Sequence, residues 1–146
     1  MSETTTKSLA EFIAEHAITM TAERADANPN MNDKGYALAL GRPEMDHWRI
    51  VLKCGSRRMS TYFSKGLGHH GAEPTAAEVL DCLASDAAGV ANADSFEDWA
   101  GDYGYDTDSR SAHKTYTICK RQAERLRKLL GDEQAYDGLL FSIERE

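Results

Sequence analysis

The chain has 146 residues, of which 41% are hydrophobic and 28% charged, and its formal net charge is −7 at neutral pH. That length fits one domain with its own core, and no apolar run approaches the roughly 20 residues of a membrane-spanning helix. The net acidity argues against nonspecific attraction to nucleic acid as the main activity, because phosphate binding needs clustered positive charge. The polar, acidic start predicts no secretory leader, so we expect a soluble protein of the cytoplasm with no membrane partner.

The first half of the chain predicts a short helix and then strands. Residues 1–7 are predicted to be disordered, and Ser8 is expected to cap a helix that ends near Glu15. Apolar and polar residues alternate over 17–23, which predicts a half-buried strand. Residues 28–35 are rich in turn formers and predict a loop, whereas 36–40 fit no single element.

The strongest strand signal is a β-hairpin. Two β-rich runs, 48–54 and 57–63, flank the pair Gly55-Ser56. Alternation places Trp48 and Ile50 on an apolar face, and we expect the basic residues of the hairpin on the other face.

Helices are predicted after residue 72. Thr75 and Glu78 form a capping box that opens a helix to about Ala91. Asp94 or Ser95 is expected to cap a short helix that ends at a glycine.

The longest predicted helix starts at Asp108 or Ser109 and ends at Leu130, before Gly131, with basic residues along one side. A last amphipathic segment covers 133–146. Strand-rich residues 8–65 thus precede helical residues 72–146. We therefore expect a single α+β domain over 1–146, in which a small antiparallel sheet with a central β-hairpin packs against a C-terminal group of helices.

Charge is segregated along the chain. Residues 66–109 contain no Lys or Arg, although they carry ten carboxylates, and basic residues are concentrated on both sides of this segment. Aromatic residues alternate with the acids from Phe96 to Tyr105. Such a pattern could imitate the phosphates of a nucleic acid and fill a basic groove on another protein. The alternative is a solvated acidic face with Phe96 and Trp99 in the core.

Metal and catalytic motifs are weak. His69 and His70 are adjacent in a Gly-rich loop, which is a poor geometry for sharing one ion. Asp102, Asp106 and Asp108 do not have the register of a calcium loop. Cys54, Cys82 and Cys119 form no Cys-x-x-Cys pair, so we expect reduced, mostly buried thiols. No catalytic residue, metal or cofactor is predicted, and an enzyme would need an activated Cys or His in a pocket.

The stretch SFEDWAGDYGYDTDS at 95–109 and the basic residues that follow to Gly131 resemble a family of small phage and prophage proteins, most without an assigned function. The hairpin and residues 73–87 belong to the same likeness. Some small phage proteins of this kind are anti-CRISPR inhibitors that act as acidic mimics of DNA. The resemblance implies a protein of the bacterial host cytoplasm that binds a CRISPR-Cas effector and blocks its DNA binding. We assign the partner-binding role to Glu97, Asp98, Trp99, Asp102, Tyr103, Asp106 and Asp108.

The alternative function is that of a phage accessory protein that binds nucleic acid directly. Arginines at the hairpin turn and the basic face of the long helix would meet the phosphates. The residues assigned to this alternative are Arg57, Arg58, Lys120 and Arg121. A third possibility is that the same cations only solvate the surface and pair with the acidic segment.

Overall fold

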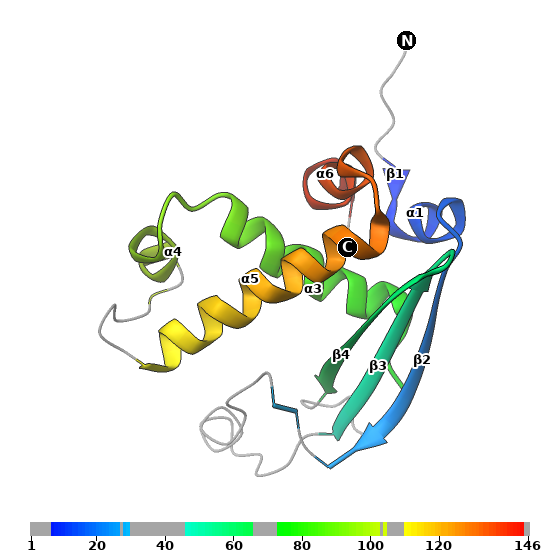
Figure 1. Cartoon of the computed structure of the whole chain (residues 1–146), viewed down its shortest axis with the longest axis horizontal. Coiled ribbons are helices and arrows are strands. Elements are labelled where there is room, and N and C mark those ends of the chain that lie inside the picture. The colour runs from blue at the N-terminus through cyan, green and yellow to red at the C-terminus, as the bar shows by residue number, and fades with distance from the viewer. Residues whose placement is uncertain are drawn as a thin grey trace.

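A computed structural model describes residues 7–26, 28–29, 46–65, 73–102, 104 and 110–144. It confirms the predicted α+β class, with a small antiparallel sheet and helices packed against it (Figure 1). Residues 36–40 and the pair His69-His70 lie outside the described residues, as does most of the predicted loop over 28–35.

The sheet has three strands in the order β2-β3-β4: β2 (Ile18–Ala25), β3 (Asp46–Cys54) and β4 (Arg57–Lys65). Both pairings are antiparallel, with Cys54 opposite Ile18 on one side and opposite Arg57 on the other. The predicted hairpin is confirmed. Its turn depends on Gly55, whose φ of +64° is costly for a residue with a Cβ.

Helices cover one face of the sheet, here called the inner face. Ile50, Leu52 and Met59 point from it into the main core. The opposite, outer face carries Arg49, Lys53 and Arg58, which are exposed. The expectation that all basic residues of the hairpin share that outer face is wrong for two of them. Arg57 and Lys65 alternate onto the inner face, where both have partners in the helices.

The five described helices are α1 (Leu9–Glu15), α3 (Ala76–Ala91), α4 (Phe96–Asp102), α5 (Arg110–Leu130) and α6 (Glu133–Phe141). Ser8 caps α1, and the Thr75 and Glu78 capping box opens α3. Ser95 accepts a hydrogen bond from Asp98 N at the start of α4. Gly131 ends α5 with a φ of +68°. The predicted helix boundaries up to Leu130 are therefore confirmed where the structure describes them.

The end of the chain differs from the prediction. The last helix stops at Phe141, and β5 (Ile143–Glu144) pairs in parallel with β1 (Lys7–Ser8). Lys7, predicted to be disordered, thus belongs to a strand. A partner more than 130 residues away in sequence fixes both ends, and local periodicity contains no record of such a contact.

Two clusters of buried side chains hold the elements together. The main core lies between the inner face of the sheet and α1, α3, α5 and α6. A second, smaller cluster joins α4 to α5 through Trp99, Ala100 and Cys119. None of the described helices is long and apolar enough to cross a membrane.

Candidate nucleic-acid interface

The exposed side of α5 carries a row of cations. At about 100° per residue, the cations of this row fall within an arc of about 60° on the helix surface. They extend over about 27 Å of the helix axis, at 1.5 Å per residue. All of them are exposed, and we call them the basic stripe: Arg110, Lys114, Arg121, Arg125 and Lys128.

Within the described part of the chain, no residue of the basic stripe forms an ion pair. Arg125 is held by neutral acceptors, namely Ser60 O at 3.3 Å and Gln122 Oε1 at 3.4 Å, and it has no carboxylate partner among the described residues. Arg127, which lies beside the stripe, is different, because Glu124 and Glu133 each bind it at 3.0 Å. The stripe therefore offers cationic side chains that no carboxylate of the described residues neutralises.

Contacts with the sheet hold α5 in place. Gln122 Nε2 donates to Thr61 Oγ1 in a buried hydrogen bond. At the end of the helix, Arg57 Nε donates to Leu129 O at 2.7 Å and its Nη2 to Leu130 O at 2.8 Å. The basic stripe thus lies on a helix that is fixed at its middle and at its carboxyl end.

The four residues predicted for nucleic-acid binding do not lie together. Arg57 caps α5, and Arg58 points to the outer face, beside Lys53 across the hairpin. Lys120 and Arg121 are both exposed on α5. Arg121 is part of the basic stripe, whereas Lys120 lies beside it with its Nζ 5.3 Å from the centre of the Tyr116 ring. Of the four predicted residues, only Arg121 therefore belongs to the basic stripe.

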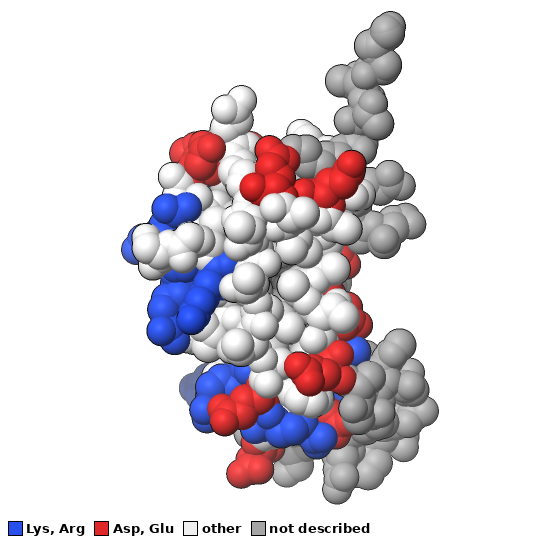
Figure 2. Space-filling model, turned by 90° about the vertical axis from the view of Figure 1, so that its right-hand side faces the viewer, with Lys and Arg blue, Asp and Glu red and all other residues white. Residues whose placement is uncertain are grey.

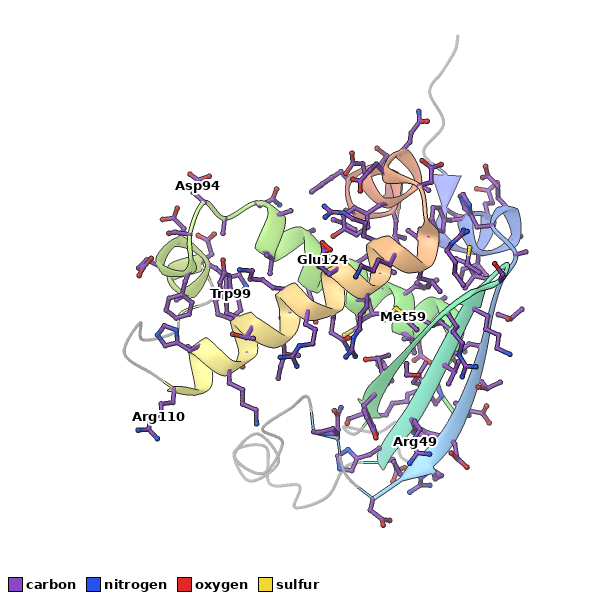
Figure 3. All side chains as sticks on the ribbon, viewed as in Figure 1. Arg49, Met59, Asp94, Trp99, Arg110 and Glu124 are labelled. Atoms are coloured by element: carbon purple, nitrogen blue, oxygen red, sulfur yellow. The ribbon has the colours of Figure 1, made fainter. Side chains whose placement is uncertain are left out.

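Four residues of the stripe were not singled out from the sequence: Arg110, Lys114, Arg125 and Lys128. The signal that finds them is the spacing of cations by three, four or seven residues along one helix. Arg110 is the first residue of α5, and its side chain points away from the helix and from Asp94 (Figure 3).

Charges are also unevenly distributed elsewhere on the surface. Seen from the side of α1 and the β3–β4 turn, Lys and Arg gather along one edge of the molecule (Figure 2). Acidic residues lie mainly above and below an uncharged area in the same view. In the lower part of this view basic and acidic residues are intermixed, and the sheet carries the ion pairs Arg24–Asp46 and Arg49–Glu23. The segregation of charge along the sequence is therefore not kept over this whole surface.

A hollow of about 530 Å³ opens beside α5. Its walls are formed by five residues of α5 and by Pro29; those of α5 are His113, Lys114, Thr117, Ile118 and Arg121. The imidazole of His113 stacks on the Phe96 ring, with centroids 3.9 Å apart and planes at 17°. The hollow therefore combines positive charge with apolar and aromatic surface.

The structure describes only some of the acidic residues that were predicted to bind a partner. Glu97, Asp98 and Asp102 are exposed on α4. With Asp94, which precedes α4, we call them the α4 acidic patch. Tyr103, Asp106 and Asp108 lie outside the described residues.

Trp99 does not serve as a surface anchor. It is 3% exposed and points from α4 toward α5, where its ring centre lies 5.1 Å from that of Tyr116 (Figure 3). The role predicted for it at a partner interface is wrong in this structure, because the indole is enclosed by its own fold. The alternative reading of Trp99 as a core residue is correct.

The acids of segment 66–109 do not all serve one surface. Glu78 closes a capping box and binds Lys65, whose side chain is 8% exposed, at 3.1 Å. Burial alone would raise the Glu78 pKa, but the Thr75 backbone hydrogen bond and Lys65 outweigh it, and the pKa is lowered. Partial burial raises the pKa of Asp86. Some carboxylates of this segment therefore stabilise the fold, whereas others are exposed to solvent.

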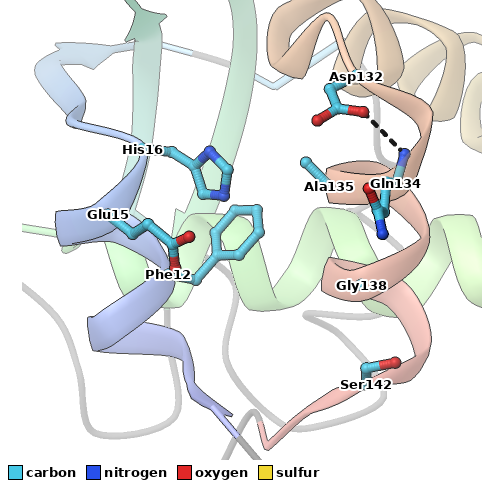
Figure 4. A pocket seen from close by; sticks show the side chains of 8 residues that line it. All are labelled: Phe12, Glu15, His16, Asp132, Gln134, Ala135, Gly138 and Ser142. Atoms are coloured by element: carbon cyan, nitrogen blue, oxygen red, sulfur yellow. Dashed lines mark hydrogen bonds between the residues drawn. The ribbon is translucent and has the colours of Figure 1, made fainter.

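A second cavity, of about 360 Å³, lies between α1 and α6 (Figure 4). His16 packs against Phe12 in it, with ring centres 4.3 Å apart. Asp132 caps α6 by accepting a hydrogen bond from Gln134 N at 3.0 Å. The histidine and this carboxylate therefore have roles in packing and capping.

The cysteines are free, and Cys54 and Cys119 are buried as expected, whereas Cys82 is exposed. Desolvation, with added effects of nearby groups, raises the pKa of Cys82 to about 11 and that of Cys119 to about 12. Both thiols are protonated at neutral pH, so neither is an activated nucleophile. The described residues contain no cluster of His, Cys, Asp and Glu that could hold a metal ion.

Comparison of the chain with protein-family models, with curated proteins and with solved structures gives no match.

Proposed function

We propose that this protein binds nucleic acid through the basic stripe of α5. The observation that carries the proposal is the alignment of five exposed cations on one side of a helix, without a carboxylate partner among the described residues. Binding of phosphates by such side chains releases condensed counterions, and this release is the main source of affinity in nonspecific complexes. The net charge of −7 works against nonspecific attraction to nucleic acid, so the proposal depends on the local field of the aligned cations.

The position of the stripe supports the same function. Over about 27 Å, at the helical rise of 1.5 Å per residue, a strand of nucleic acid presents several phosphates. Because α5 is anchored at Thr61 and Arg57, its cations are displayed on a rigid support. The protein would then be an accessory protein that acts by binding, without a chemical step.

Fluorescence anisotropy with labelled DNA and RNA oligonucleotides at low salt tests the proposal. The variant Arg121→Gln/Lys128→Gln removes two charges from the stripe and is expected to weaken binding by at least tenfold. The matched control Lys53→Gln/Arg58→Gln removes the same charge from the outer face of the sheet and should bind like the original protein. Equal affinity of the two variants, or no binding by the original protein, would overturn the proposal.

A second candidate function is inhibition of a CRISPR-Cas effector through acidic mimicry of DNA. It is supported by the α4 acidic patch, whose four carboxylates are exposed and form no ion pair within the described residues. We place it second because Trp99 is buried and supplies no anchor, and because part of the acidic segment has structural roles.

The mimicry candidate is tested by capturing the tagged protein from lysates that express a panel of CRISPR effectors, with washes at low and high salt. The variant Glu97→Gln/Asp98→Asn/Asp102→Asn should lose a captured effector, whereas Asp26→Asn/Asp137→Asn, which neutralises exposed acids elsewhere, should retain it. Capture that survives neutralisation of the α4 acidic patch would contradict mimicry.

A further inference from the structure

The basic stripe has one wide interval, and the hollow beside α5 lies there. Between Lys114 and Arg121 the stripe has no cation for about 10 Å of helix, at the rise of 1.5 Å per residue. Thr117 and Ile118 occupy that interval and form the wall of the hollow between the two cations. A volume of about 530 Å³ is within the roughly 300–1,000 Å³ of small-ligand sites.

The walls of the hollow suit one unstacked nucleotide. Lys114 and Arg121 can bind the phosphates on either side, while Ile118 and the Pro29 ring offer apolar surface to a base. The planar guanidinium of Arg121 is also able to stack on a base. Single-strand binding sites likewise combine a charged groove that follows the backbone with side chains that receive bases, and aromatic side chains have that role in most of them.

An aromatic stack stiffens one wall. The His113 ring lies on Phe96, which in turn stacks with Trp99 at a centroid distance of 6.2 Å. Trp99 is buried in the second core cluster, so the stack extends from the core to the hollow. His113 therefore stands in a fixed orientation at the edge of the site.

A duplex does not fit this arrangement. Its bases are stacked and paired in the interior, so a convex helix such as α5 would meet only phosphates, or base edges in a groove. The hollow would then remain empty. We propose that the hollow between Lys114 and Arg121 binds one unstacked base of a single-stranded nucleic acid; this inference rests on the proposed binding of nucleic acid by the basic stripe.

The sharpest probe compares strands that differ only in their bases. We would measure anisotropy with a labelled oligothymidine, an abasic strand with the same number of phosphates, and a duplex. Stacking on an aromatic side chain contributes on the order of 1–3 kcal/mol per base, or about 5- to 160-fold in affinity. Contact with the apolar walls of this hollow belongs to the lower end of that range, so the oligothymidine should bind at least about fivefold more tightly than the abasic strand. The duplex should also bind more weakly than the oligothymidine. An oligouridine of the same length serves to separate RNA from DNA as the source of the strand.

A substitution in the wall of the hollow tests whether the difference in affinity between the oligothymidine and the abasic strand arises there. Ile118→Ala leaves all charges in place and should reduce the advantage of oligothymidine over the abasic strand severalfold, with little effect on the abasic strand itself. Val51→Ala, at a half-buried position on the outer face, is the matched control and should change neither affinity. Circular dichroism verifies that both variants remain folded.

The outcomes separate the two proposals. Equal affinity for oligothymidine and the abasic strand would overturn the single-strand site and leave phosphate binding by the stripe intact. Binding to none of the probes would overturn both proposals. A preference for oligothymidine that Ile118→Ala leaves unchanged would also contradict the assignment of the base to this hollow.

Discussion

Arg57 closes the carboxyl end of α5, because its Nε donates to Leu129 O at 2.7 Å and its Nη2 donates to Leu130 O at 2.8 Å. The last carbonyls of a helix have no partner within the helix, and the negative end of the helix dipole favours a cation there. An arginine at the start of β4 therefore fixes the helix that carries the basic stripe.

Replacement of Arg57 should destabilise the fold. Arg57→Ala leaves two helix carbonyls to water and removes two charge-assisted hydrogen bonds, so we expect a loss of about 1–2 kcal/mol in the free energy of unfolding. Arg58→Ala, one residue away on the outer face, should change it by less than about 0.5 kcal/mol. Urea unfolding followed by circular dichroism measures both. Similar losses in the two variants would show that the helix end does not depend on Arg57.

Gly131 and Arg57 should show energetic coupling. A Cβ at Gly131 would lie 2.6 Å from Arg57 Cζ, and the φ of +68° is itself unfavourable for alanine. Gly131→Ala should therefore cost more than the roughly 1–2 kcal/mol of the left-handed conformation, because the guanidinium must leave its carbonyls. Gly55→Ala has a similar φ of +64° with open space around the Cβ, and should incur the conformational cost alone.

A double-mutant cycle isolates the contact. In an Arg57→Ala background, Gly131→Ala should lower the free energy of unfolding by no more than Gly55→Ala does. Additive effects of Arg57→Ala and Gly131→Ala would contradict the close packing of these two residues.

The ion pair of Lys65 with Glu78 should make stability depend on pH. The pKa of Glu78 is lowered from its ordinary 4.5 in the folded protein, so this stabilisation is present above about pH 4.5 and is lost as the pH falls through the folded pKa. Glu78→Gln should cost about 1–2 kcal/mol at pH 7, less than a fully buried pair, since the Glu78 side chain is 40% exposed. The difference between the variant and the original protein should shrink below pH 4.5 in urea titrations.

Asp137→Asn is the control for that titration, because Asp137 is an exposed carboxylate that forms no ion pair within the described residues. Its effect on the free energy of unfolding should be close to zero throughout. A difference for Glu78→Gln that stays constant from pH 7 to pH 3 would count against the pair as the source of pH dependence.

The thiols should react slowly in the native protein. With a pKa of about 11 for Cys82 and about 12 for Cys119, less than about one thiol in a thousand is ionised at pH 7.5. We expect iodoacetamide to modify these two residues far more slowly than it modifies the denatured chain, as measured by mass spectrometry of peptides. Rapid native modification of Cys82 would mean that its thiolate is stabilised by a contact absent from this structure.

Local signals in the sequence predict most of the fold. Thr75 and Glu78 form a capping box within four residues, and Gly55-Ser56 separates two alternating runs, so these elements are encoded where they form. Arg57 looked like a surface cation because its partners lie 72 and 73 residues away. The pairing of Lys7 with Ile143 was missed for the same reason.

The candidate site was predicted less well than the fold. The spacing of basic residues in the α5 segment predicts a basic side of the helix. Whether each cation is available to bind phosphate depends on whether it already has a carboxylate partner. Arg127 has two carboxylate partners, whereas Arg121, six residues earlier, has none among the described residues. Burial of Trp99 is likewise a result of the packing of α4 on α5, which no periodicity within a seven-residue helix could establish.

The measurement that tests the central claim most directly is the salt dependence of binding to a single-stranded oligonucleotide. The logarithm of the affinity should fall linearly with the logarithm of the salt concentration, with a slope of about −0.7 for each phosphate contacted. Removal of two stripe cations in Arg121→Gln/Lys128→Gln should make the slope shallower by about 1.4, and Lys53→Gln/Arg58→Gln should leave it unchanged. A slope that is the same for both variants and the original protein would show that the basic stripe of α5 does not contact nucleic acid.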